Sequence, residues 1–188
     1  GFKKVLAMDT SGLKETDIKA RGKDRMAHVD EDGVDFRSVI DGSKHRFTPE
    51  VSIQIQHQLG ADIMFAFDEL TTLVDTREYQ ESSVERTHRW ARRCLEEHNR
   101  QTQLRADKPL QALWGVVQGA QYEDLRRQAT RGLVSLSDEF EAEGMRGFGG
   151  YGIGGALEKE NLGTIVQWVC DELPVDKPRH LLGISEPD

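Results

Sequence analysis

The sequence has few cysteines, no long apolar run and a shortage of positive charge. Its two cysteines, Cys94 and Cys170, are too few for a disulfide framework or, by themselves, a zinc site, which favours a reducing cytoplasm. No stretch approaches the ~20 consecutive apolar residues of a membrane-spanning helix, and no secretory or transit segment is recognised, so we expect no membrane partner. The 25 Lys and Arg against 33 Asp and Glu give a net charge of −8. This balance argues against broad non-specific nucleic-acid binding, but it allows a local basic patch.

The 188 residues are 37% hydrophobic and 31% charged, a mixture that is typical of a globular domain with a buried core. Residues 1–25 are rich in lysine and small residues, and we predict that they form a mobile loop. Residues 26–47 contain two turn signals, Asp32-Gly33 and Asp41-Gly42, between short alternating runs. This pattern predicts a β-meander built from hairpins.

The pattern changes at residue 48. A helix is predicted to begin at Pro49, to be capped by Thr48 and to end at Gly60, because each residue type is favoured at that helix position. Three apolar residues share one face of this helix, at i, i+4 and i+8: Val51, Ile55 and Leu59.

The remaining chain alternates strands and helices. Strands are predicted at 63–67, 111–117, 151–153 and 180–182, and helices at 78–99, 122–134 and 158–172. In the first of these helices Arg86, Arg89, Arg92 and Arg93 are expected to point mostly outward. Such alternation indicates parallel strands joined by helices. A closed (β/α)8 barrel takes ~250 residues, so the expected α/β fold is about half of a TIM barrel, and an open doubly wound sheet is the alternative.

Polar residues and glycines follow each predicted strand, where ligands bind in parallel α/β folds. They are Asp68-Glu69, Gln118-Gly119, Gly154-Gly155 and Gly183. A carboxylate, a carboxamide and accessible backbone amides together suit the edge of a purine. Singly, each residue is better explained as a cap, a backbone partner or a turn. Their occurrence at successive strand ends favours a binding site.

Two other patterns carry less weight. Residues 147–152 satisfy the G-x-G-x-x-G pattern, but they precede a strand instead of following one, so they are interpreted as a flexible linker. The six histidines form no metal-binding pattern and pair with no cysteine at ligand spacing, so no metal site is expected within this chain.

A longer set of ordered motifs, such as Glu85-Arg86-Thr87 and Gly115-Val116-Val117-Gln118-Gly119, resembles that of the tRNA-guanine transglycosylases, the queuine tRNA-ribosyltransferases, and most strongly their bacterial branch. The resemblance covers about residues 33–188. Its other blocks are 34–38, 40–45, 48–50, 53–57, 59–63, 66–69, 89–90, 122–126, 150–151, 153–155 and 183–184.

The resemblance implies an enzyme with a (β/α)8 barrel that exchanges guanine at the wobble position of tRNAs with GUN anticodons for a 7-deazaguanine, preQ1 or queuine. In the family an aspartate forms a covalent enzyme–RNA intermediate, which divides one hard displacement into two easier ones. The general base is expected before Gly1, and the nucleophilic aspartate and a structural zinc cluster are expected after Asp188. The segment Asp9-Thr10-Ser11-Gly12 mimics the general-base segment and is interpreted as a loop.

This chain is therefore expected to be the central part of one TIM-barrel catalytic domain. It would hold base-recognition residues but no catalytic group, and it would be inactive alone. The complete protein is expected to be a homodimer. A non-catalytic tRNA-binding subunit is the alternative, and the intact base-reading residues argue against it.

The resemblance also assigns roles to single residues. Asp68 matches the residue that reads the purine N–H edge, and Gln118 and the Gly155 amide match groups that contact the base carbonyl. Ala156 is expected to face the 7-substituent, with the acid Glu160 behind it. The RNA-binding segment aligns with Gly183, Ile184, Ser185, Glu186, Pro187 and Asp188.

Three positions depart from the bacterial pattern. Leu70 replaces Cys, Ala156 replaces Leu, and Ser185-Glu186 replaces Gly-Lys. The smaller Ala156 predicts more room at the 7-position of the base, and the acidic Glu186 puts one phosphate contact in doubt.

Overall fold

The computed structural model describes residues 27–155 and 157–183, which fall into two compact units divided between Phe47 and Thr48. In the first unit, β1 (Ala27–Val29), β2 (Val34–Arg37) and β3 (Lys44–Phe47) form an antiparallel sheet in the order β1-β2-β3. The Asp30 carboxylate accepts hydrogen bonds from the amide N–H groups of Asp32 and Gly33 and so fixes the first turn. The predicted β-meander is confirmed. The loop predicted over residues 1–25 lies outside the described residues.

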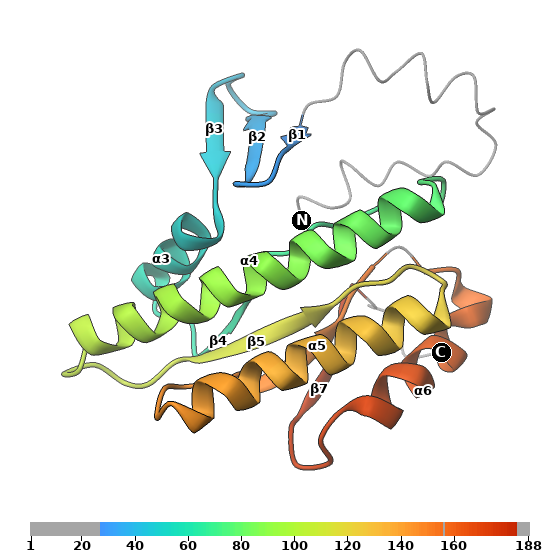
Figure 1. Cartoon of the computed structure of the whole chain (residues 1–188). Coiled ribbons are helices and arrows are strands. Elements are labelled where there is room, and N and C mark those ends of the chain that lie inside the picture. Colours follow the sequence, from blue (N-terminus) through green and yellow to red (C-terminus); the bar gives the residue numbers. More distant parts are fainter. Residues whose placement is uncertain (1–26, 156, 184–188) are drawn as a thin grey trace. The chain divides into compact units, whose positions relative to one another are not determined.

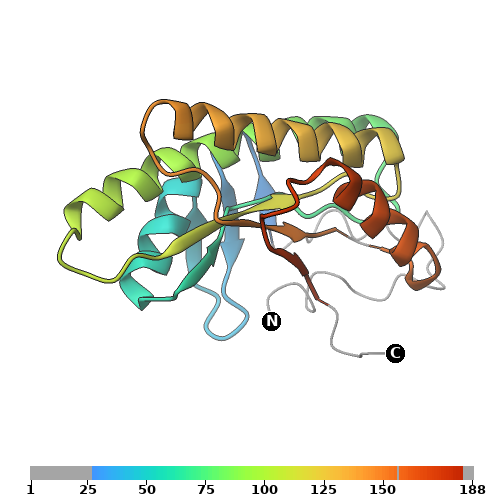
Figure 2. The same ribbon diagram turned by 90° about the horizontal axis from the view of Figure 1, so that it is seen from below.

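The second unit contains a four-stranded parallel sheet in the order β4-β5-β6-β7. The strands are β4 (Ile63–Phe65), β5 (Ala112–Val117), β6 (Gly150–Ile153) and β7 (Arg179–Leu181). Each strand pairs with the next one along the chain, without the reversal of strand order that defines a doubly wound sheet. The sheet therefore curls as half of a (β/α)8 barrel, as Figure 2 shows, and the predicted partial TIM barrel is confirmed.

Helices run beside this sheet in chain order (Figure 1). They are α3 (Pro49–Leu59), α4 (Arg77–Leu104), α5 (Glu123–Ala142), the short 3₁₀ helix η2 (Lys159–Asn161) and α6 (Leu162–Glu172). Ion pairs connect successive helices: Arg93 binds Glu50, Arg92 binds Glu139, and Arg131 binds Glu172. None of the described helices is long and apolar enough to cross a membrane.

The core of the second unit lies between the strands and the helices. It is formed by fully buried apolar side chains from both layers, among them Ile53, Met64, Leu95, Leu113, Val117 and Leu136. Because burying such a side chain stabilises a fold by about 1.5–3 kcal/mol, this layer holds the strand ends in fixed positions.

Helix α3 begins and ends as predicted. The Thr48 hydroxyl accepts a hydrogen bond from the Val51 N–H at 3.3 Å, and Gly60 caps the C-terminus of the helix in the left-handed conformation. Its inward face differs from the expected one. Ile53 and His57 are buried, whereas Leu59 is 77% exposed. The side chain of His57 is buried because it pairs with His98 of α4, with their ring nitrogens 3.0 Å apart.

The segment around residues 147–152 also differs from the prediction, because the flexible-linker interpretation is wrong. Phe148 is fully buried, and its amide N–H donates to the Ser137 hydroxyl at 2.8 Å. Gly150 already belongs to β6, and a Cβ at this residue would lie 2.6 Å from the Trp114 ring. The glycines therefore permit close packing. Helix α5 extends to Ala142, beyond the predicted end at residue 134, because its buried side continues through Leu136 and Phe140.

Candidate functional site

The polar residues after β4 and β5 meet at the carboxyl edge of the sheet. The Gln118 side-chain Nε2 donates to Asp68 Oδ2 at 2.5 Å. Gln118 directly follows β5 and is 2% exposed, while Asp68 follows β4 and is half-buried. The structure thus brings together two of the side chains that the sequence singles out, and it presents an acceptor and a donor side by side.

Asp68 is held in place through its neighbour Phe67. The Phe67 amide N–H donates to the Cys94 sulfur at 3.2 Å, and its ring stacks on Trp90 with 5.0 Å between ring centroids. Burial raises the pKa of the Cys94 thiol to about 12. Cys94 is therefore a neutral packing residue at neutral pH, because nucleophilic chemistry requires the thiolate.

Glu69 points away from this pair and binds α4. Its carboxylate accepts hydrogen bonds from the Tyr79 hydroxyl at 2.5 Å and from Arg86, and its amide N–H donates to Thr87 Oγ1 at 3.1 Å. Burial, followed by the hydrogen bond to Glu69, raises the pKa of Tyr79 to about 12. Of the two adjacent carboxylates, only Asp68 contacts Gln118. The Arg86 side chain is only 18% exposed, so its expected outward position is wrong. Within the motif Glu85-Arg86-Thr87, Arg86 and Thr87 fix the end of β4 through their hydrogen bonds with Glu69.

The end of β6 packs against Gln118. The Gly154 N–H donates to the Val117 carbonyl at 3.0 Å, and a Cβ at Gly154 would lie 3.0 Å from Gln118 Nε2. The next residue, Gly155, has a φ of +109°, a conformation that side chains disfavour. The two glycines therefore allow the β6 backbone to approach the carboxamide.

Sequence reasoning missed Arg126. This side chain is fully buried, and it donates hydrogen bonds to the carbonyls of Val117, Ala120 and Gly154 at 3.0, 2.8 and 2.7 Å. The available signal was its place on α5 beside buried Leu125 and one turn before buried Thr130. A charged residue on the inward side of a helix is unusual unless it is paired.

The other predicted site residues are not part of this cluster in the described chain. Glu160 is exposed in η2, and its carboxylate contacts neither Asp68 nor Gln118 by a hydrogen bond in the described part of the chain. Gly183 is exposed, with a φ of +80°. Ala156 and residues 184–188 lie outside the described residues. The roles assigned to these residues stay predictions.

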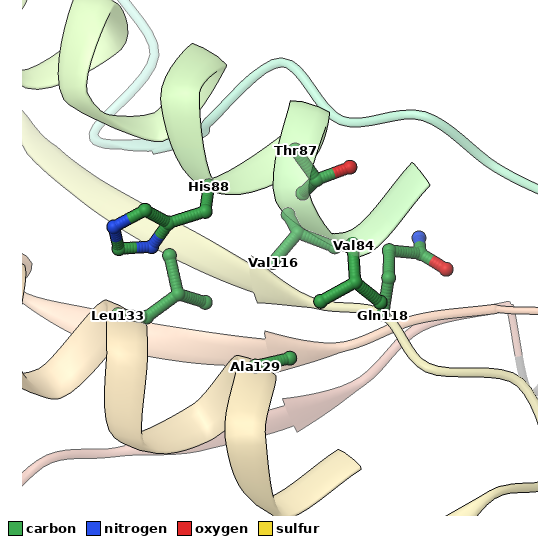
Figure 3. A pocket seen from close by; sticks show the side chains of 7 residues that line it. All are labelled: Val84, Thr87, His88, Val116, Gln118, Ala129 and Leu133. Atoms are coloured by element: carbon green, nitrogen blue, oxygen red, sulfur yellow. The ribbon is translucent and has the colours of Figure 1, made fainter. Parts of the chain in front are cut away.

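A cavity of about 10 Å³ lies between α4 and α5 and is lined by Val84, Thr87, His88, Val116, Gln118, Ala129 and Leu133 (Figure 3). Its volume is that of about one water molecule, whereas small-molecule sites occupy about 300–1,000 Å³. This cavity therefore does not hold a nucleobase. Within residues 27–155 and 157–183, no three His, Cys, Asp or Glu side chains are grouped to hold a metal ion.

Comparison with known proteins identifies the family. The family model described as queuine tRNA-ribosyltransferase matches residues 1–188. The queuine tRNA-ribosyltransferase of Geobacillus kaustophilus is 42% identical over 163 residues, which are 85% of this chain and 38% of the relative. The chain belongs to the queuine tRNA-ribosyltransferase family.

Two further relatives carry the name of the same family. A putative queuine tRNA-ribosyltransferase of Archaeoglobus fulgidus is 44% identical over 92% of this chain and 39% of its own length, and the Bacillus subtilis queuine tRNA-ribosyltransferase is 41% identical over 87% and 39%. The chain thus spans about two fifths of the length of these members of the family. The family resemblance inferred from the motifs is confirmed.

Proposed function

We propose that the protein containing this chain is a tRNA-guanine transglycosylase that exchanges guanine at the tRNA wobble position for a 7-deazaguanine. The observation that carries this proposal is the direct contact between Asp68 and Gln118 at the carboxyl ends of adjacent parallel strands, in a chain of the queuine tRNA-ribosyltransferase family. Ligands of parallel α/β folds bind at this edge.

The chemistry of the pair fits one edge of guanine. An ionised carboxylate only accepts hydrogen bonds, and a carboxamide both donates and accepts. In the proposed complex Asp68 accepts the purine N–H groups, and Gln118 and the Gly155 amide donate to the base carbonyl. In the free structure Gln118 Nε2 donates to Asp68, so base binding replaces this internal hydrogen bond. Guanine and 7-deazaguanines share this edge, so one set of residues can hold the leaving and the entering base.

The proposed reaction follows the family. An aspartate beyond this chain attacks ribose C1′ as the C1′–N9 bond to guanine breaks, and the 7-deazaguanine then displaces the aspartate. The base must leave its stack to reach the site. The zinc that the resemblance implies is assigned to the region after Asp188 and enters no step here. Within the described residues, no cluster of three His, Cys, Asp or Glu side chains could hold it. The GUN anticodon, the cytoplasmic location and the homodimer belong to the same proposal.

The test is exchange of labelled guanine into tRNA by the complete protein, its Asp68→Asn variant and a matched control. Hydrogen bonds to a charged group contribute about 1.5–3 kcal/mol each, so the loss of two predicts exchange reduced about 100-fold or more in Asp68→Asn. The control is Asp62→Asn, because Asp62 is exposed just before the same strand, and it should exchange like the unaltered protein.

Two results contradict the proposal. Exchange by Asp68→Asn within about threefold of the unaltered protein would show that Asp68 does not read the base. Binding of tRNA without any exchange would instead favour the non-catalytic subunit.

A further inference from the structure

Two buried polar atoms at the ends of β5 and β6 have no hydrogen-bond partner among the residues that the structure describes. They are Nη2 of Arg126 and Oε1 of Gln118. Both adjoin Gly155: a Cβ at this residue would lie 2.6 Å from Arg126 Nη2 and 3.2 Å from Gln118 Oε1. Unsatisfied buried polar atoms are costly and rare. Gln118 Oε1 is an acceptor and cannot bind a carbonyl, but the unpartnered Arg126 Nη2 donor lies beside the glycine that is expected to contact the base carbonyl. This position points to a role of Arg126 in binding the base.

Arg126 carries a charge that no acidic side chain offsets. Its three hydrogen bonds go to backbone carbonyls, and no ion pair involves it among the described residues. Burial lowers the pKa of Arg126 to about 10, so the guanidinium stays protonated at neutral pH. An isolated buried charge costs several kcal/mol. The buried guanidinium therefore creates a positive electrostatic potential at the carboxyl edge of the sheet.

The same side chain holds an unusual stretch of backbone. Gly119 and Ala120 have φ values of +128° and +48°, and Ala120 is the only residue other than glycine with a positive φ in the described chain. Arg126 Nε donates to the Ala120 carbonyl, while its Nη1 donates to Val117 and Gly154. Strained backbone persists where the surroundings over-determine it. Arg126 therefore connects the loops after β5 and β6, from which Gln118 and Gly155 extend.

We propose that Arg126 is a positioning residue for base exchange, which holds Gln118 and the Gly155 peptide in register and places a positive charge beside the expected base carbonyl. This inference rests on the proposed function. When the C1′–N9 bond breaks, its electron pair passes to the purine, and the negative charge spreads to the carbonyl oxygen before the base is protonated. A preorganised positive charge near that oxygen stabilises the transition state more than the ground state.

The two contributions can be separated by substitution in the complete protein. Arg126→Met removes both the charge and the hydrogen bonds, and we expect the KM for guanine to rise about 10-fold and kcat to fall about 100-fold, the latter being the effect of losing one preorganised donor. Arg126→Lys keeps the charge but lacks the fork of donors that reaches three carbonyls. It should recover most of kcat while KM for guanine stays raised. Affinity for tRNA should change less than about threefold in both variants.

Arg131→Met is the matched control, since Arg131 lies on the same helix and its side chain is 64% exposed in an ion pair with Glu172. It should leave both kinetic constants unchanged. If Arg126→Met does not fold, Arg126→Lys decides alone, because a KM like that of the unaltered protein would overturn the inference. Equal loss of kcat in the Lys and Met variants would overturn the role of the charge. Absence of exchange in the unaltered protein would instead refute the proposed function.

Discussion

Replacing Glu69 by Gln tests the idea that helix α4 positions the base-reading strand end. Glu69→Gln preserves the shape of the side chain but removes the negative charge that pairs with Arg86. The Glu69 and Arg86 side chains are only 3% and 18% exposed, so the pair lies in a poorly solvated environment. Removing one partner of such a pair costs about 3–5 kcal/mol. The Tyr79 hydroxyl can still donate to the new amide oxygen, so we expect the low end of this range.

The assay is thermal unfolding followed by tryptophan fluorescence, because Trp90 stacks on Phe67 two residues before Glu69. The measurement uses the complete protein, which has about 430 residues if 163 residues are 38% of its length, as in the Geobacillus kaustophilus relative. At about 2.1 cal/mol/K of unfolding entropy per residue, a loss of about 3 kcal/mol then predicts a Tm lower by about 3 °C. Guanine exchange should also fall, since Asp68 is the adjacent residue.

The matched control is Glu85→Gln on α4. Glu85 Oε2 and Arg89 Nη1 are 3.9 Å apart, and the two side chains are 65% and 51% exposed. Exposed pairs contribute little, so the Tm should not change. A Glu69→Gln variant as stable and as active as the unaltered protein would show that the pair of Glu69 and Arg86 does not hold the end of β4.

Two further predictions concern Gly155 and His98. Gly155→Ala should reduce exchange and lower the free energy of unfolding by about 1–3 kcal/mol, because the φ of Gly155 is +109° and the new Cβ would meet Arg126. Urea unfolding measures this loss. The control is Gly163→Ala, which has no atom within 4 Å of its Cβ and should be at least as stable as the unaltered protein. Burial, followed by the charge of His57, lowers the pKa of His98 to about 4 from 6.5, so the unfolded chain binds the proton first as pH falls. The free energy of unfolding should therefore fall by at most about 3 kcal/mol between pH 7 and pH 4, and a His98→Gln variant with the same pH slope in urea titrations would contradict this.

The sequence predicts the fold well because its main signals are local. Short apolar runs ended by polar residues locate the four parallel strands, and Asp-Gly pairs locate the meander. Thr48 and Gly60 act as helix caps whatever surrounds them. The placement of Asp68 and Gln118 follows from the rule that parallel strands end at one edge.

What the sequence could not show depends on packing between segments that are distant in the chain. The position of residues 147–152 before a strand suggested a flexible linker, but the absence of side chains at the glycines lets the backbone pack on Trp114 and Ser137. Pattern alone cannot tell which of Asp68 and Glu69 faces α4. The partners of Arg126 are backbone carbonyls, which no sequence pattern reveals, so only its place on the inward side of a helix could have indicated its role.

The most direct test of the base-reading role of Asp68 compares guanine with hypoxanthine, which lacks the 2-amino group, as competitors in tRNA exchange. Guanine should inhibit at about 10-fold lower concentration than hypoxanthine, since a hydrogen bond to a charged acceptor contributes about 1.5–3 kcal/mol. Asp68→Asn should abolish most of this preference, and Asp62→Asn should retain it. An undiminished preference for guanine in Asp68→Asn would show that Asp68 does not read the base.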